Sequence, residues 1–331
     1  MRYRHFGRTG FDVSEIGHGL WGMGGWSDKS DVDSLRALQS SVDLGCNFFD
    51  TAWAYGEGHS DSLLGRILGD NPGKRLYAAS KVPPKNRKWP ATAQYKLHDV
   101  FPLDHVVEHA EKIRTALGTD AIDVLQYHVW DDSWAGQDEF RDTIEELKSR
   151  GLIRAFGLSL NRWEPENGIA AIHTGLVDCV QVIYNIFDQA PEDRLFPVCR
   201  ERNIGVIARV PLDEGSLGGR LTLNTRFPEG DWRAMYFGAE NLKPTVERVE
   251  RLKKVVAEYR DRGAAYPQSL PEMAFRFILS NPDVSTTIPG MRKDSHVRSN
   301  LATSDAGQLP PDLLNELRNH RWDRKPQKWS A

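Results

Sequence analysis

Four polar residues follow three successive apolar segments of the chain. Asp50 and Tyr55 come after the first segment, Lys81 ends the second and His128 ends the third. A phenol is a poor proton donor near neutral pH unless a neighbouring cation stabilises the phenolate, and a buried cation needs a counter-ion to stay charged. These residue types therefore predict Tyr55 as a general acid, with Lys81 as the cation beside it and Asp50 as the counter-ion.

Each of the four residues also has a structural explanation. An Asp at a strand end often caps a turn, and a tyrosine often lies at the edge of a core. Lys81 could be solvated, and His128 could be a core histidine with satisfied hydrogen bonds. However, the ends of consecutive parallel strands form a single rim in a barrel, so the four residues together favour a shared site.

Eight short apolar runs alternate with helical segments along the 331 residues. Buried strands that alternate with helices imply parallel pairing and right-handed crossovers, so eight units predict an α/β fold of the (β/α)8 TIM-barrel type. We expect a single such domain over residues 1–331, with an N-terminal β-hairpin over 3–13 at the bottom of the barrel. The runs begin near Ile16, Cys46, Leu76, Ile122, Ile153, Val177, Ile204 and Val284.

Two connections, 82–121 after the third strand and 210–283 after the seventh, are much longer than the others. Long loops on a catalytic rim are often binding elements. Their aromatic side chains either wall a substrate pocket or pack their own loops, and the sequence leaves both open. These side chains are Trp89, Tyr95, Phe101, Phe227, Trp232, Tyr236 and Phe237. Apolar periodicity predicts helices through Val32, Leu35, Leu38 and Val42, and through Val249, Leu252, Val256 and Tyr259, with stops at Gly118 and Gly151.

Composition favours a soluble enzyme. The formal net charge is only -3 with 40% hydrophobic residues, and no basic block predicts a nucleic-acid or anionic membrane partner. Three cysteines without Cys-x-x-Cys spacing predict reduced, buried thiols rather than disulfides. There is no apolar signal core or membrane-spanning run, so we expect a cytoplasmic protein. The short basic tail after Trp322 is expected to be frayed.

The sequence contains neither of the two common cofactor motifs. The glycines of 22–25 have the wrong spacing for Gly-x-Gly-x-x-Gly, which disfavours a Rossmann dinucleotide domain. No His-Glu-x-x-His or paired-cysteine cluster is present, so no metal site is predicted.

A series of short motifs occurs in one order along the chain: Asp-Thr-Ala-x-x-Tyr-Gly from Asp50, Ser-Lys at Lys81, then His128, Gly-x-Ser at Ser159, Val-Gln-Val at Gln181, Pro-Leu at Pro211 and Ile-Pro-Gly-x-Arg at Arg292. Each motif is weak alone, but the ordered set resembles the aldo-keto reductases, up to Asn300. The resemblance implies a catalytic tetrad of Asp50, Tyr55, Lys81 and His128, and NADPH bound across the barrel mouth.

The resemblance also assigns residues to the cofactor. Ser159 and Gln181 would hold the carboxamide, while Pro211, Leu212, Gly215 and Leu217 would line the pyrophosphate, where backbone N–H groups can approach closely. Arg292, assisted by Lys293, precedes a helix expected near Ser295, which favours a 2′-phosphate and hence NADPH over NADH. The remaining cofactor positions are Trp21, Asp50, Gly290, His296 and Asn300. The substrate pocket would be lined by Trp21, Trp53, Trp89 and Trp130.

Arg209 departs from the family pattern, because many members carry an aromatic residue there that stacks on nicotinamide. A planar guanidinium can also stack, but it adds charge beside the ring. The alternative is that Arg209 points away and pairs with Asp213 or Glu214.

The predicted activity is NADPH-dependent reduction of an aldehyde or ketone, such as a sugar or aryl carbonyl, with Tyr55 protonating the oxygen. One alternative keeps the fold but not the turnover: a nucleotide-sensing regulatory subunit similar to potassium-channel β-subunits. A glycosidase that uses Asp131 and Asp132 is disfavoured, because adjacent residues at a strand end point apart. The sequence does not predict the oligomeric state.

Overall fold

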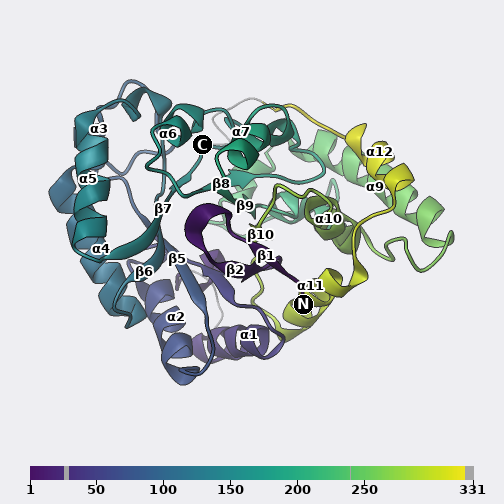
Figure 1. The fold of residues 1–331 in the computed structure, drawn as a ribbon. Coiled ribbons are helices and arrows are strands. Elements are labelled where there is room, and N and C mark those ends of the chain that lie inside the picture. The colour runs from purple at the N-terminus through teal and green to yellow at the C-terminus, as the bar shows by residue number, and fades with distance from the viewer. Residues whose placement is uncertain (26–29, 239, 325–331) are drawn as a thin grey trace.

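The computed structural model describes residues 1–25, 30–238 and 240–324, and its centre is a parallel sheet of eight strands (Figure 1). Neighbours in the sheet follow chain order, and the bridges Ile16–Thr287 and Gly19–Gly290 join its first and last strands. The sheet therefore closes, which confirms the predicted (β/α)8 barrel. Its strands are β3 (His18–Gly19), β4 (Phe48–Asp50), β5 (Tyr77–Val82), β6 (Ile122–Tyr127), β7 (Ile153–Ser159), β8 (Cys179–Ile183), β9 (Gly205–Arg209) and β10 (Thr286–Thr287).

Helices surround the barrel, as Figure 1 shows. Strands β4 to β8 are buried along their whole length and read as continuous apolar runs because helices cover them, apart from Arg154. The α-helices are α1 (Asp31–Asp43), α2 (His59–Asp70), α3 (Leu97–Val100), α4 (Leu103–Leu117), α5 (Asp138–Ser149), α6 (Ile169–His173), α7 (Leu195–Glu201), α8 (Arg233–Tyr236), α9 (Leu242–Arg260), α10 (Leu270–Leu279), α11 (Asp294–Ala302) and α12 (Pro311–Arg318).

The N-terminal hairpin covers one end of the barrel, as predicted. Its strands β1 (Tyr3–His5) and β2 (Asp12–Ser14) pair antiparallel, with Tyr3 opposite Ser14. Phe6 is fully buried and packs on Phe48 of β4 with a ring-centroid distance of 5.4 Å. A Cβ on Gly205 would lie 2.6 Å from the Phe6 ring, so the ring needs a glycine at the start of β9. The hairpin therefore contributes to the core.

The helix patterns are confirmed in α9, where Val249, Leu252, Val256 and Tyr259 are all buried. Gly118 ends α4 with a left-handed φ of 65°, the helix stop that the sequence predicts. The prediction for α1 is partly wrong. Leu38 and Val42 are buried, but Val32, in the first turn, is 64% exposed.

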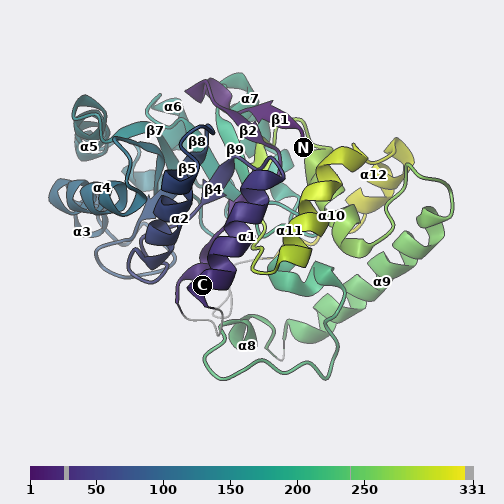
Figure 2. The same ribbon diagram turned by 90° about the horizontal axis from the view of Figure 1, so that it is seen from below.

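The long connection after β9 adds a second, smaller apolar cluster. Four of its aromatic side chains, Phe227, Trp232, Tyr236 and Phe237, pack with Leu221 and Val246, so they pack their own loop. Phe101, in the connection after β5, is also buried and stacks on Tyr127 at 3.9 Å. Figure 2 shows α8 at the opposite end of the barrel from the hairpin.

The segment from Trp322 to Arg324 packs on the barrel, although the sequence gives no sign of it. The backbone N–H of Trp322 donates to the carbonyl of Phe187 at 2.8 Å, and the Arg324 side chain is 3% exposed. The expectation that residues after Trp322 fray is therefore wrong for Arg324, while the tail from Lys325 lies outside the described residues. Across the described ranges, no helix is both long and apolar enough to cross a membrane. All three cysteines are free and buried.

Candidate active site

Asp50 and Lys81 form a buried ion pair at the rim. They lie at the carboxyl ends of the neighbouring parallel strands β4 and β5, and Lys81 Nζ donates to Asp50 Oδ2 and to the Thr51 carbonyl, both at 2.7 Å. Their exposed fractions are 2% and 0%. Burial lowers the pKa of Lys81, but Asp50 and Tyr55 outweigh burial and raise it overall, so Lys81 stays charged.

Two glutamines hold the other oxygen of Asp50. Gln181 Nε2 donates to Asp50 Oδ1 at 2.7 Å, and Gln126 Nε2 reaches the same oxygen at 3.4 Å. The structure therefore places Gln181, which the sequence assigns to the cofactor carboxamide, against Asp50. Gln126 was missed by the sequence analysis. Its position along β6 could have revealed it. Gln126 lies two residues before His128, so both side chains point to the same side of the strand, and it pairs with Lys81 on β5.

Tyr55 and His128 lie together above this pair and are only half-buried. Their rings are edge to face at 5.8 Å, and Lys81 Nζ lies 5.2 Å from the Tyr55 ring centroid. Tyr55 is placed by a tight turn after β4. Gly56 in that turn has a φ of 73°, and a Cβ there would lie 2.2 Å from the Gly24 carbonyl oxygen, so only glycine fits. The structure thus brings all four predicted residues together.

The protonation states of these two groups follow from burial and from two cations. Burial raises the pKa of Tyr55, and Lys81 and Arg209 only partly oppose this. Lys81 thus acts in the predicted direction, but burial outweighs it. Burial, reinforced by Lys81 and Arg209, lowers the pKa of His128 well below 6.5. The phenol and the imidazole are therefore both neutral near pH 7, and both can donate a hydrogen bond.

Arg209 ends β9 and is half-buried. Its Nη2 donates to the Leu160 carbonyl at 2.9 Å. Burial and the neighbouring Arg162 lower its pKa to about 10. The predicted alternative of a pair with Asp213 or Glu214 is wrong: Asp213 meets Arg324 at 3.0 Å, and Glu214 meets Arg162 at 2.7 Å.

The four predicted pocket tryptophans have different surroundings. Trp89 is 43% exposed and packs edge-on against His128 at 5.7 Å, while Trp21, just after β3, is 49% exposed. Trp53 is half-buried and packs against His109 of α4 at 5.9 Å. Trp130 is fully buried, with its ring 4.8 Å from that of Phe140 in α5. The assignment of Trp130 to the pocket wall is therefore wrong, because it faces the core.

The residues assigned to the cofactor lie on three rim segments. Ser159, the last residue of β7, pairs with Gln181 in the middle of β8. In the 210–217 segment Pro211 and Leu217 are buried and Leu212 is half-buried, while Gly215 is exposed and nothing lies within 4 Å of the point that a Cβ would occupy there. Around α11, the groups at Gly290, Arg292, Lys293 and His296 are exposed and Asn300 is 9% exposed. The helix begins at Asp294, close to the predicted start.

These segments fit a dinucleotide. The open backbone at Gly215 suits a pyrophosphate, and the exposed Arg292 directly precedes the N-terminus of α11, where an anion is favoured. The Arg292 side chain also lies against Gly22, where a Cβ would be 2.7 Å from Arg292 Cδ. This glycine of the loop after β3 therefore leaves room for the guanidinium.

The adjacent carboxylates Asp131 and Asp132 have separate structural roles. Asp131 accepts from the Ser133 backbone and hydroxyl, whereas Asp132 accepts from Trp130 and from the start of α6, so the two carboxylates do not act on a common point.

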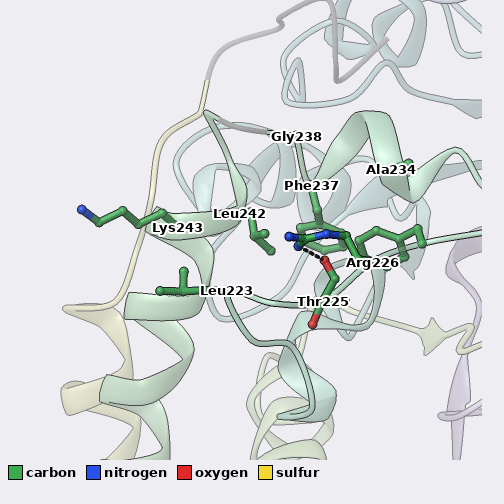
Figure 3. Close-up of a pocket in the computed structure, with 9 residues that line it drawn as sticks. Leu223, Thr225, Arg226, Ala234, Phe237, Gly238, Leu242 and Lys243 are labelled. Atoms are coloured by element: carbon green, nitrogen blue, oxygen red, sulfur yellow. Dashed lines mark hydrogen bonds between the residues drawn. The ribbon is translucent and has the colours of Figure 1, made fainter.

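An open pocket of about 440 Å³ lies under α8 and contains none of the tetrad (Figure 3). Phe227, Phe237 and Leu242 are among the residues that line it, together with Arg226 and Lys243.

Comparisons with known proteins agree with this fold and rim. The aldo/keto reductase family profile matches residues 15–321, so the chain belongs to that family. Aldo-keto reductase YhdN of Bacillus subtilis is 27% identical over 311 residues, which cover 90% of this chain and 87% of the relative. The NADH-specific methylglyoxal reductase of Escherichia coli is 26% identical over 334 residues, which cover 96% and 98%. The solved glycerol dehydrogenase AKR11B4 of Gluconobacter oxydans has the same fold, with a TM-score of 0.77, 24% identity and 98% coverage of both chains.

Family membership confirms the resemblance seen in the sequence. Members of this family are generally oxidoreductases, and the family uses nicotinamide cofactors.

Proposed function

We propose that this protein reduces an aldehyde or ketone with NADPH, acting in the cytoplasm as a single barrel domain. The observation that carries this proposal is the division of the tetrad by exposure. Tyr55 and His128 lie side by side and reachable, while the Lys81–Asp50 pair is buried behind them. A site that protonates a substrate oxygen needs this order, because the donor must touch the substrate and its charged supports must stay out of water.

The tetrad residues divide the proton chemistry. When bound, the nicotinamide cofactor supplies the hydride. Tyr55 gives its proton to the oxygen that becomes the alcohol, and its raised pKa keeps it protonated at neutral pH. Lys81 stabilises the phenolate left behind, and His128 donates a hydrogen bond that positions the carbonyl oxygen. Charge on that oxygen develops only in the transition state, so these donors act on the rate more than on ground-state binding.

Asp50 acts through Lys81. It holds the ammonium at 2.7 Å, and Gln181 and Gln126 fix its second oxygen. We propose that Gln181 keeps this role and offers its carbonyl oxygen to the carboxamide, with Ser159 beside it. One amide can serve both partners because its nitrogen donates and its oxygen accepts.

The preference for NADPH rests on Arg292 and Lys293. Both are exposed at the start of α11, where a 2′-phosphate would meet a guanidinium and the helix N-terminus together. Relatives are named for both choices, one as NADH-specific and another with NADP(+). The preference for NADPH therefore depends on these side chains.

A nucleotide-sensing role without turnover is less well supported, since the acid, its cation and the counter-ion are all present and in contact. The test is fluorescence titration with NADPH and NADH, followed by turnover on sugar aldehydes, aryl aldehydes and diketones. We expect tighter NADPH binding and measurable reduction of at least one class. Tight binding without turnover on the whole panel would favour the sensing role.

A further inference from the structure

A buried ionic cluster joins the C-terminal segment to the rim loops. Arg324 Nη2 contacts Asp188 Oδ2 and lies 3.0 Å from Asp213 Oδ1, and Arg324 Nη1 donates to the Tyr236 hydroxyl at 2.8 Å. Tyr236 in turn donates to Asp213 Oδ1 at 2.8 Å. We call these four residues the Arg324 cluster. Its members come from the loops after β8 and β9, from α8 and from the end of the chain.

Arg324 is firmly placed. Its guanidinium lies 4.7 Å from the ring centroids of both Trp163 and Trp322, and its side chain is 3% exposed. The Trp322 backbone is hydrogen-bonded to Phe187 on the loop after β8. A desolvated guanidinium is costly to bury unless it is paired, and here the two Nη atoms of Arg324 contact Asp188, Asp213 and Tyr236.

Hydrogen bonds connect the cluster to both ends of the segment 210–216. At the far end, Asp213 accepts from the Ser216 hydroxyl at 2.7 Å. At the near end, Asn185 Nδ2 bridges Asp188 Oδ2 at 2.9 Å and the Val210 carbonyl at 3.1 Å. Arg324 is therefore linked to Ser216 through Asp213, and to Val210 through Asp188 and Asn185.

The backbone of this segment needs such restraint. Val210, Asp213 and Glu214 have φ values of 57°, 43° and 55°, in the left-handed region that side chains other than glycine rarely adopt. For a β-branched residue such as Val210 the conformation is especially unfavourable, and it persists only where the surroundings hold it. The Arg324 cluster holds Asp213 directly, and Asn185, which donates to Asp188 of the cluster, holds the Val210 carbonyl.

We propose that Arg324 is a positioning residue for the cofactor: it holds the 210–217 segment in the shape that accepts the pyrophosphate. The proposal rests on the proposed function, since Pro211, Leu212, Gly215 and Leu217 are the residues assigned to that group. It makes the segment around Arg324 part of the cofactor site, although this segment lies outside every motif of the sequence.

The charges around Asp213 indicate what loss of Arg324 would do to the segment. Burial pushes the pKa of Asp213 upward, but Arg324, Ser216 and Tyr236 together bring it below its ordinary value, so Asp213 is a carboxylate. Without Arg324, this carboxylate and Asp188 would face each other in a desolvated space. Uncompensated buried charge strongly favours opening of the loop towards water.

The test compares Arg324→Gln with Arg321→Gln, a control three residues earlier whose guanidinium pairs with Asp193 at the surface. In the cofactor-free protein, we expect amide hydrogen exchange in 210–217 to speed up roughly tenfold or more in Arg324→Gln only, because a local opening equilibrium has shifted. NADPH release should also speed up roughly tenfold, while kcat at saturating NADPH changes less than about twofold.

Two further variants keep the test informative if Arg324→Gln folds poorly. Arg324→Lys should retain part of the exchange protection, because it keeps one charge but not the fork of donors. Adding Asp213→Asn to Arg324→Gln should cost less than the sum of the two single effects, because the unpaired carboxylate is gone.

Unchanged exchange and NADPH release in Arg324→Gln would overturn the proposal. Faster exchange throughout the barrel would also overturn it, in favour of a general contribution to stability. If the wild-type protein binds neither nucleotide, the proposed function fails and the cofactor role fails with it. The exchange data would then still show whether Arg324 orders the segment.

Discussion

The Tyr55 hydroxyl is the tetrad group that can give a proton to a substrate oxygen. Tyr55→Phe removes that proton and leaves the ring against His128, so turnover should fall by roughly two to four orders of magnitude. NADPH binding, measured by fluorescence, should change little. Tyr3→Phe is a matched control, since its hydroxyl binds the Gly45 carbonyl on the hairpin side. Near-normal turnover in Tyr55→Phe would remove Tyr55 from the role of acid.

Arg292 tests the cofactor preference. If it binds a 2′-phosphate, the charge-assisted contact contributes about 1.5–3 kcal/mol, so Arg292→Ala should weaken NADPH roughly tenfold or more and leave NADH nearly unchanged. The control is Arg298→Ala, within α11, where the guanidinium pairs with Asp294 at 2.7 Å. Equal losses for NADPH and NADH in Arg292→Ala would show that the residue does not read the phosphate.

Asp61 is a buried carboxyl behind the site, and no sequence pattern singled it out. It accepts from the Ser80 hydroxyl at 2.6 Å, next to Lys81, and burial raises its pKa to about 7. Its folded pKa thus exceeds its unfolded value near 4, so the folded state binds the extra proton between these values. Stability should therefore fall as pH rises from about 4 to about 7, by up to about 1.4 kcal/mol per pH unit from this group.

Urea unfolding across this pH range checks the Asp61 prediction. Asp61→Asn should flatten that part of the pH profile, while Asp70→Asn, at the exposed end of the same helix, should leave it unchanged. An identical slope in Asp61→Asn and the wild type would show that the carboxyl is ionised at all these pH values.

At the scale of elements, the strands were predictable because burial on both faces leaves continuous apolar runs, and the runs at Ile122 and Ile153 begin where β6 and β7 begin. Side-chain direction was less predictable. His128 and Trp130 both follow β6, yet one faces the rim and the other packs on Phe140. Proximity to a strand end does not specify a face, and the turn after the strand decides it.

Gly56 tests how the element after β4 places Tyr55. Gly56→Ala meets two costs: a left-handed φ of 73° and a Cβ 2.2 Å from the Gly24 carbonyl oxygen. Gly118→Ala meets only the first, because φ is 65° and nothing lies within 4 Å. Urea unfolding should show a loss of about 1–2 kcal/mol for Gly118→Ala and a larger one for Gly56→Ala.

Turnover separates the two glycine variants further. Only Gly56→Ala should lose kcat as well as stability, since the displaced turn carries Tyr55. If both variants lose the same stability and keep kcat, the loop after β3 yields to the extra methyl group, and the turn does not position the acid.

For the whole molecule, two contacts between residues far apart in the chain differ in whether the sequence could reveal them. Arg324 meets Asp188 across 136 residues, and Gln181 meets Asp50 across 131. The Gln181 partner follows from the barrel once the strands are counted, because β4 and β8 belong to the same closed sheet. The Arg324 contact follows from no periodicity or motif, since the path of a C-terminal extension is set only by the surface that it finds.

The hairpin end of the barrel contributes to stability, and the other end carries the tetrad. Substitution of Phe6 tests whether the two ends are independent. Phe6 is fully buried at the hairpin end, whereas the tetrad lies at the carboxyl ends of the strands. Phe6→Ala leaves a cavity beside Phe48 and Gly205, so the free energy of unfolding in urea should drop by about 3–5 kcal/mol. Because the proposed substrate site lies at the rim, kcat of the folded fraction should stay within about twofold of wild type.

Phe11→Ala, at the partly buried ring that stacks on Tyr77, provides a smaller perturbation of the same hairpin. It should cost less stability than Phe6→Ala and should likewise spare kcat. A large loss of kcat in the folded Phe6→Ala protein would mean that the hairpin transmits strain through the strands to the rim, since its side chains lie at the far end from Tyr55. In that case the barrel would act as one mechanical unit, with the hairpin contributing to the geometry of the acid as well as to the core.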